Sequence, residues 1–252
     1  MAWRRHLFYT RTSTRTTWKL RLAVLALVVL IAAATRGVWT AQLGRSLVCT
    51  EEVAPSDLII VENFDPHYLV FERAAALQAA GLAAKALVPV KASRNPGVPN
   101  SVSKGIAEVM ARQARLATWE VLPIQETEPV TLNAAAQLRE YLTRERVRSV
   151  IVVTEGFRSR RSTLAYQTVL GPAGIQVRCV PVFGTNTPGT WTQSWHGVQE
   201  VVEQLGKLQY YRFYVVPVLV RVRHAADPLA SEPGAPRAAR VPAASSRPSW
   251  LP

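Results

Sequence analysis

Polar and charged side chains follow several short apolar runs of the chain. They supply carboxylate, amide, hydroxyl and guanidinium groups at Glu62, Asn63, Glu126, Thr131, Asn133, Thr154, Glu155, Arg158, Arg160 and Arg161. Arginines near a helix N-terminus suit phosphate or carboxylate, because the guanidinium group binds bidentately and the helix end donates N–H groups. A desolvated carboxylate such as Glu126 could act as a general acid or base. The alternative is that these charges are solvated loop residues of little consequence.

The elements that would position these residues alternate between strand and helix from Ser56 onward. Strands are predicted over residues 58–61, 86–90, 119–124, 150–154 and 177–182, and helices over 68–80, 102–117, 130–145, 159–170 and 194–210. Strands that are apolar throughout are typical of a parallel sheet with both faces covered. The regular alternation predicts an α/β fold, a Rossmann-like three-layer α/β/α sandwich with a mainly parallel sheet, preceded by one transmembrane helix.

In an open parallel sheet the ligand crevice lies at the carboxyl ends of the strands, where all of these polar residues fall. We therefore expect a small anionic ligand at this edge. Arg158, Arg160 and Arg161 would hold the anion. Glu126, together with Thr131 and Asn133, would orient it.

The net charge of +13 is unevenly distributed, and its location argues against a nucleic-acid partner. Residues 1–50 carry eight basic and no acidic residues, whereas residues 51–210 carry 16 basic and 15 acidic ones. A nucleic-acid-binding domain needs its basic excess on the folded surface, where phosphates dock. Here the excess lies around an apolar run, so we expect no nucleic-acid partner.

That apolar run, residues 22–34, contains 13 uncharged residues and is flanked by Trp18 and Trp39. Six basic residues and no acidic residue precede it. Aromatic flanks and the positive-inside rule predict an uncleaved anchor at 18–39, with the N-terminus in the cytoplasm and the domain on the other side. A cleaved signal peptide with small residues at 32–34 is the main alternative, and a soluble helix is a third.

The rest of the chain divides into a basic N-terminus (1–17), a linker (40–55), the α/β domain (56–223) and a Pro/Ala-rich tail (224–252) that is expected to be disordered. Within the domain, residues 211–223 favour a final edge strand, because β-branched residues are frequent there. An interfacial segment that touches lipid is the alternative. The two cysteines, Cys49 and Cys179, could form a disulfide bond.

Several familiar signatures are missing from the sequence, so it assigns no cofactor. It contains no GxGxxG motif after the first strand, no Walker GxxxxGK[ST] motif and no GxSxG elbow. Its four histidines are scattered, and no Cys/His cluster has the spacing of a zinc site.

The chain resembles the ElyC/SanA/YdcF family, a domain-of-unknown-function group of bacterial envelope proteins, over about residues 56–211. The matching stretches are SDLIIVENF, ETEPVTLNAAAQLREYL, VRSVIVVTEGFRSRRSTLAYQTVLGPAGIQVRCVPV and WTQSWHGVQEVVEQLGKLQYY. Thr154 and Arg161 occupy the places of the family's strand-end Thr and helix-opening Arg. The last stretch is similar to the family's closing helix, with Trp195, Glu200, Glu203 and Lys207.

The resemblance implies a Rossmann-like domain behind one anchor in the bacterial cytoplasmic membrane, with a role in envelope maintenance. Its ligand would be nucleotide-like or a phosphate-bearing lipid-linked group. The sequence departs from the family at Glu62-Asn63, Asn133 and Arg158, where Gly-Gly, Glu and His are common. A non-catalytic scaffold with a degenerate site is therefore one alternative function, and a hydrolase or transferase of envelope precursors is another.

Overall fold

A five-stranded sheet forms the centre of the molecule in the computed structural model, which describes residues 17–64, 67–95 and 97–219. The strand order is β3-β2-β1-β4-β5, and every neighbouring pair is parallel. The strands are β1 (Leu58–Val61), β2 (Lys85–Lys91), β3 (Trp119–Ile124), β4 (Ser149–Glu155) and β5 (Gln176–Val182). The predicted α/β class and parallel sheet are confirmed.

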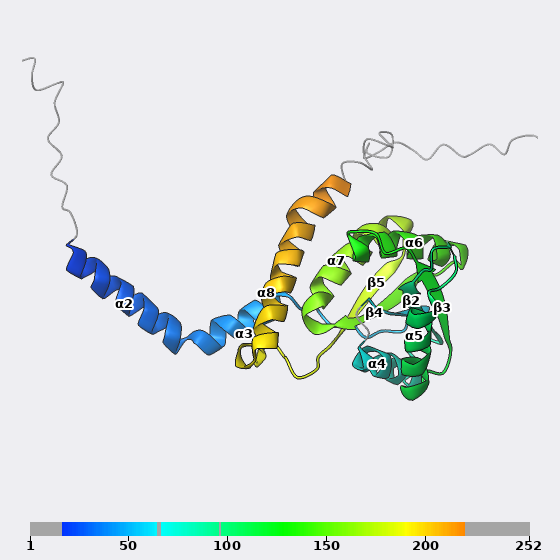
Figure 1. The fold of residues 1–252 in the computed structure, drawn as a ribbon, viewed down its shortest axis with the longest axis horizontal. Coiled ribbons are helices and arrows are strands. Elements are labelled where there is room, and N and C mark those ends of the chain that lie inside the picture. The colour runs from blue at the N-terminus through cyan, green and yellow to red at the C-terminus, as the bar shows by residue number, and fades with distance from the viewer. Residues whose placement is uncertain (1–16, 65–66, 96, 220–252) are drawn as a thin grey trace, which may run out of the picture.

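Helices cover both faces of this sheet and complete three layers (Figure 1). On one face lie α4 (Tyr68–Ala79) and α5 (Ser101–Gln113), and on the other lie α6 (Val130–Arg144) and α7 (Ser159–Leu170). Short 3-10 turns connect some elements: η1 (Gly156–Arg158), η2 (Gly171–Ala173) and η3 (Trp191–Gln193).

Two hydrophobic cores explain why the central strands are apolar throughout. Successive side chains of a strand point to opposite faces of the sheet. In β1, Ile60 packs in the core beneath α6 and α7, whereas Ile59 packs in the core beneath α4 and α5. Val152 and Ile151 of β4 divide between the same two cores. Both faces must therefore be apolar, which is why these strands are easily recognised in the sequence.

A third core joins the last long helix, α8 (Trp195–Tyr210), to the segment that precedes the sheet. Leu47, Trp191 and Val201 are buried together there. The indole N–H of Trp191 also donates to the carbonyl of Thr40, in α3 (Arg36–Ser46), at 3.0 Å. Figure 1 shows α8 beside α7 rather than on the sheet. Much of the expected 40–55 linker is therefore fixed against the domain.

The edge strand predicted for residues 211–223 from their β-branched content is not formed by the described part of the segment, residues 211–219. A π-helical turn, η4 (Tyr211–Val215), continues α8, and residues 216–219 are also helical, while 220–223 lie outside the described residues. The prediction fails because tertiary packing overrides local propensity: Tyr211 and Val215 are buried in the core beneath α6 and α7. The turn lies just before Pro217, which has no N–H to donate.

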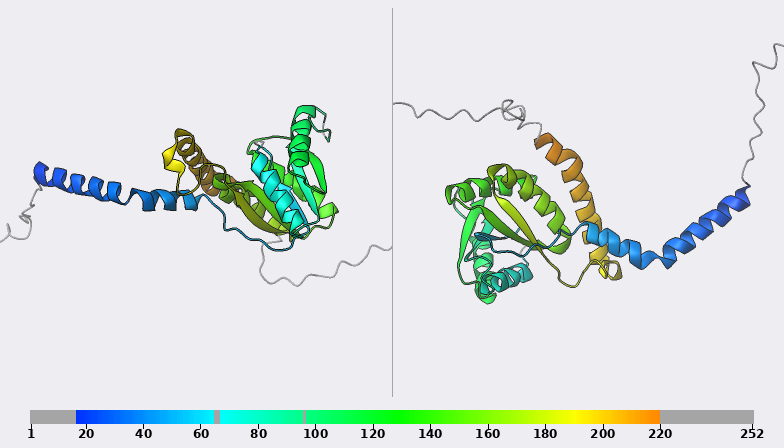
Figure 2. Two further views of the ribbon diagram at one scale, coloured as in Figure 1. Left: turned by 90° about the horizontal axis from the view of Figure 1, so that it is seen from below. Right: turned by 180° about the vertical axis from the view of Figure 1, so that it is seen from behind.

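The N-terminal helix α2 (Trp18–Ala34) projects from the domain and has no buried residue (Figure 2). Between residues 17 and 219, no single helix is long and apolar enough to cross a membrane, but α2 and α3 pass that test together as a pair bent by 66°. The expected span 18–39 is thus interrupted at Thr35, whose hydroxyl donates to the carbonyl of Ile31 at 2.7 Å. The predictions for residues 1–16 and 224–252 lie outside the described residues.

Candidate functional site

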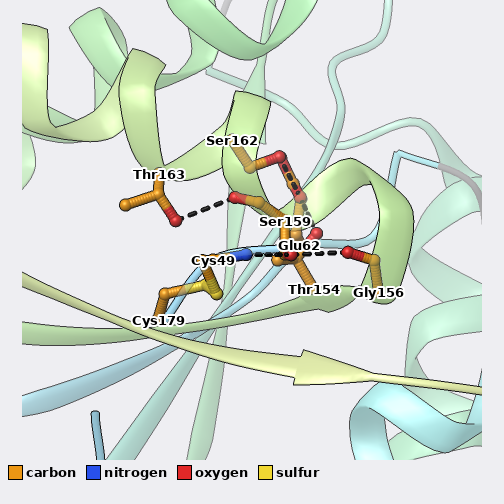
Figure 3. Close-up of a disulfide and its surroundings, with 8 residues drawn as sticks. All are labelled: Cys49, Glu62, Thr154, Gly156, Ser159, Ser162, Thr163 and Cys179. Atoms are coloured by element: carbon orange, nitrogen blue, oxygen red, sulfur yellow. Dashed lines mark hydrogen bonds between the residues drawn. A yellow bond between two sulfur atoms is a disulfide. The ribbon is translucent and has the colours of Figure 1, made fainter. Parts of the chain in front are cut away.

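The carboxyl ends of β1 and β4 lie side by side at the point where the strand order reverses, which is where open α/β sheets bind ligands. Glu62 follows β1 and is 2% exposed. Its carboxylate accepts hydrogen bonds from the hydroxyl groups of Thr154, at the end of β4, and Ser162, in α7, the latter at 2.7 Å. Glu62 therefore ties two strands to one helix and is shielded from solvent (Figure 3).

The first turn of α7 is held by a second buried contact. The hydroxyl of Ser159 accepts the N–H of Cys49 at 2.9 Å and donates to the carbonyl of Gly156. Cys49 forms a disulfide bond with Cys179 of β5, with sulfur atoms 2.05 Å apart. The bond and its neighbours are drawn in Figure 3. The segment after α3 is thus fixed both to the edge strand and to the helix that carries the site arginines.

Arg161 is a buried cation that has no carboxylate partner among the residues that the structure describes. The residue is 7% exposed. Its Nη1 donates to the Thr131 hydroxyl at 3.0 Å, its Nε donates to Gln204 Oε1 at 3.4 Å, and its guanidinium carbon lies 5.2 Å from the centre of the Tyr211 ring. None of the ion pairs among residues 17–64, 67–95 and 97–219 involves it.

A cavity of about 360 Å³ opens at Arg161, and we call it the Arg161 pocket. Its charged and aromatic lining consists of Phe64, Glu126, Glu128, Arg158, Arg161, Lys207 and Tyr210–Tyr211. Two of these charges are compensated locally: Lys91 Nζ lies 2.9 Å from Glu126 Oε2, and Lys207 pairs with Glu203. Burial raises the pKa of the Tyr211 hydroxyl, while the charge of Arg161 lowers it, so this phenol stays protonated at neutral pH.

A second cavity, of about 330 Å³, lies on the other side of Arg158, which lines both. We call it the Glu200 pocket, and its other titratable lining residues are His67, Glu155, His196, Glu200 and Glu203. Arg158 Nη2 lies 3.5 Å from Glu155 Oε2. Burial raises the pKa of Glu200, and the charge of Glu155 raises it further. A carboxyl group with a raised pKa keeps its proton to a higher pH than an ordinary one.

The Glu200 pocket contains histidine and carboxylate side chains, which are residue types that bind metal ions. No group of three His, Cys, Asp or Glu residues in the described part of the chain is placed to hold a metal ion. Its acidic side chains outnumber its one arginine, whereas the Arg161 pocket has more basic than acidic residues. The two cavities therefore differ in charge, and Arg158 lies between them.

The expected site residues are divided by the fold. Thr131, Arg158, Arg161 and Glu126 line the Arg161 pocket, while Glu155 lines the Glu200 pocket. Glu62 and Thr154 are bonded to each other beneath the surface, and Asn63 is also buried, at 8% exposure. Asn133 donates to the carbonyl of Thr127 at 2.8 Å and so holds the preceding loop rather than a ligand.

Arg160 does not line the same pocket as Arg158 and Arg161, contrary to our expectation that the three arginines would hold one anion. Its side chain is exposed and lines a separate cavity of about 480 Å³ beside the disulfide bond. Helical geometry gives the reason, because residues one position apart on a helix point about 100° away from each other. Arg161 lines the pocket at the sheet edge, whereas Arg160 lines the cavity together with Cys49 and Thr50.

Three residues of the site were not anticipated: Ser162, Gln204 and Tyr211. Ser162 could have been found by following the buried face of α7, where Arg158, Arg161 and Ser162 recur at helical spacing. Gln204 interrupts an otherwise apolar stripe of α8 that contains Val201 and Leu208. A polar residue in such a stripe is itself a signal, since buried polar groups need a partner.

Comparison with known proteins gives no relative from which these roles could be transferred. No protein-family model matches the chain, and no curated protein matches it in sequence. The function must therefore be argued from the site itself, since one fold hosts many activities.

Proposed function

We propose that this protein is a membrane-anchored envelope protein of the ElyC/SanA/YdcF type that binds a small anionic ligand in the Arg161 pocket. The observation that carries the proposal is the buried guanidinium group of Arg161, which has only neutral partners in the described residues. Burying a cation without a counter-charge is costly. A bound anion would supply the missing charge and accept the free N–H groups.

Phosphate is the anion that best fits the lining. Arg158, Arg161 and Lys207 converge on one cavity, and the Thr131 and Tyr211 hydroxyls can donate to further oxygens. Glu126 and Glu128 at the same wall would disfavour a bare polyanion and favour a ligand that also carries hydroxyl or amino groups. A nucleotide-like molecule and a phosphate-bearing, lipid-linked sugar both meet this description.

The location of the domain is supported by three features. The disulfide bond between Cys49 and Cys179 suits an oxidising compartment outside the cytoplasm. The apolar helix α2 has no side chain that is buried by the described part of the chain. The residues before α2 are basic, which favours a cytoplasmic N-terminus. Together they support a single-pass protein of the bacterial cytoplasmic membrane with an extracytoplasmic domain.

The test uses the full chain in detergent micelles, with inorganic pyrophosphate, a nucleoside diphosphate and an isoprenyl phosphate as separate probes. We expect at least one probe to raise the melting temperature of the wild type and to bind Arg161→Gln at least about tenfold more weakly, since a hydrogen bond to a charged group contributes about 1.5–3 kcal/mol. Arg144→Gln is the matched control, because the Arg144 side chain is 73% exposed and remote from the pocket.

The outcomes separate the remaining functions. If no probe binds the folded wild type, the anion site is not functional and the non-catalytic scaffold becomes the better description. If a probe binds and is also consumed, the protein is a hydrolase or transferase, and Glu200 is the side chain whose raised pKa suits a proton donor. Equal binding by wild type and Arg161→Gln would remove Arg161 from the site.

A further inference from the structure

The C-terminal helical segment, residues 195–219, carries two apolar stripes on different faces. The inner stripe consists of Val201, Leu208, Tyr211 and Val215 and is buried against the domain. The second stripe recurs at similar helical spacing but points to solvent, and we call it the outer aromatic face: Val202, Tyr210, Phe213, Tyr214 and Val218. Phe213 is 72% exposed and Tyr214 is 60% exposed. No described segment covers this face.

The side chains of the outer aromatic face are those of a membrane interface rather than of a core. Tyr210 and Tyr214 stack with ring centres 5.5 Å apart, and both present a hydroxyl group beside an apolar ring. The guanidinium group of Arg212 lies 5.9 Å from the centre of the Phe213 ring. Aromatic residues with a polar end, accompanied by arginine, are enriched at the level of lipid headgroups.

The charge of the segment points to the same surface. From Gln204 to Ala226 the sequence contains Lys207, Arg212, Arg221 and Arg223 and no acidic residue. Arg221 and Arg223 lie outside the described residues, so their side chains are not placed. Each basic residue near an anionic bilayer contributes about 1 kcal/mol of attraction. The segment is thus both aromatic and complementary in charge to anionic lipid.

The position of the outer aromatic face in the fold is compatible with docking on the membrane that would hold α2. Figures 1 and 2 show α2, α3 and the C-terminal end of α8 on the same side of the domain, beyond β5 and away from β3 and α5. The Arg161 pocket is close to this face, because Tyr210 and Lys207 line it.

We propose that the outer aromatic face docks on the surface of an anionic lipid bilayer, as a second attachment besides α2. The inference rests on the proposed anchor but not on the identity of the ligand. Docking would hold the domain at a fixed orientation and place the mouth of the Arg161 pocket at headgroup level. A headgroup could then enter the pocket without leaving the bilayer, whereas a soluble anion would gain nothing from this arrangement.

The test measures contact between the outer aromatic face and lipid directly, in the full chain. Both native cysteines are in the disulfide bond, so one introduced cysteine is the single reactive thiol. Phe213→Cys, Val109→Cys and Val29→Cys each carry a fluorophore, and the chain is reconstituted into vesicles containing phosphatidylglycerol and nitroxide-labelled lipid. Val109 is the matched control, since it is 60% exposed on α5. Val29, in α2, reports insertion of the anchor.

We expect lipid quenching at position 213 to be several-fold stronger than at 109, and to weaken in phosphatidylcholine vesicles or at high salt. Quenching at 29 with none at 213 would overturn the docking face while leaving the anchor in place. No quenching at either position would overturn both. Shielding of position 213 that rises with protein density, without lipid quenching, would assign the face to a second copy of the chain and also overturn the proposal.

Discussion

At the scale of single residues, the edge of the sheet contains three buried charged side chains, Glu62, Arg158 and Arg161, and the first and last of them have opposite surroundings. Glu62 accepts two hydroxyl hydrogen bonds and is closed off, whereas Arg161 keeps only neutral partners and opens on a cavity. The sequence correctly placed both residues at the carboxyl edge. The sequence could not show which of the two has a structural role. That role depends on contacts with Ser162 and Gln204, which lie on helices whose rotation the sequence does not fix.

Tyr166 offers a residue-scale prediction, because its hydroxyl is fully buried and has no hydrogen-bond partner among the described residues. Removing an unsatisfied buried hydroxyl loses no bond. We therefore expect Tyr166→Phe to leave the free energy of unfolding unchanged or to raise it by up to about 1 kcal/mol at neutral pH. Urea denaturation of the full chain in micelles measures this free energy of unfolding. A loss of stability would mean that the hydroxyl has a partner.

The same substitution has a defined pH dependence. Burial, and then the charge of Glu62, raise the pKa of Tyr166 well above its ordinary value of 10.0. A raised pKa in the folded state means that its contribution to stability is intact below pH 10 and is lost as the pH rises above that value. Between about pH 8 and pH 11 the wild type should therefore lose more stability than Tyr166→Phe. Equal losses of stability in the wild type and in Tyr166→Phe would contradict the burial of the Tyr166 hydroxyl.

At the scale of elements, the sequence predicted all five strands, and their bounds differ from the observed ones by one residue at most. Continuous apolar runs such as residues 58–61 place side chains in both hydrophobic cores. A central strand does this, so few other conformations compete with it. Residues 211–219 were predicted wrongly because their composition is that of a strand while their partners, in α6 and α7, are distant in sequence. The bend at Thr35 falls where the apolar run 22–34 ends and Thr35, Arg36 and Gly37 follow, but this change of composition does not by itself predict a bend of 66°.

Two glycines of α8 give an element-scale prediction with an internal control. A Cβ atom at Gly197 would lie 2.3 Å from the backbone oxygen of Trp191, whereas a Cβ atom at Gly206 would meet nothing within 4 Å. Gly197→Ala must therefore move α8 away from η3 and should cost about 1–3 kcal/mol. Gly206→Ala should be neutral or stabilising by up to about 1 kcal/mol, because alanine favours a helix.

Chemical denaturation of both variants, with hydrogen exchange over residues 191–210, distinguishes these effects. Faster exchange restricted to Gly197→Ala is the expected result, since the third hydrophobic core depends on the contact between Trp191 and Val201. Similar stability of the two variants would show that α8 is not held at this distance from η3.

At the scale of the whole molecule, features far apart in the sequence gather on one side of the domain. The helices α2, α3 and α8 lie beyond the β5 edge (Figure 1). The disulfide bond joins the segment after α3 to β5, and the outer aromatic face belongs to α8 and its helical continuation. The opposite edge also carries an exposed apolar stripe, formed by Val102, Ile106 and Val109 of α5, but α5 contains no aromatic residue. This asymmetry is what a domain held against a membrane requires, and it could not be derived from the basic N-terminus alone.

The proposed anchor can be tested by making α2 unable to enter lipid. Leu27 and Val28 lie at the middle of α2 and are exposed, so replacing them does not disturb the folded domain. Each arginine at the centre of a membrane helix costs about 2.5–3.5 kcal/mol of insertion free energy. We expect the wild type to resist alkaline carbonate extraction from membranes, and the double variant Leu27→Arg/Val28→Arg to be released with its domain intact.

Val109→Arg, on the exposed face of α5, is the matched control and should stay with the membrane. Release of the double variant would still leave a weaker, salt-sensitive attachment if the outer aromatic face docks as proposed, because that surface does not depend on α2 for its chemistry. Retention of the double variant in the carbonate-resistant fraction would show that α2 is not the anchor. The exposed apolar surface of α2 would then require a protein partner, since 17 residues without a buried side chain are not stable in water alone.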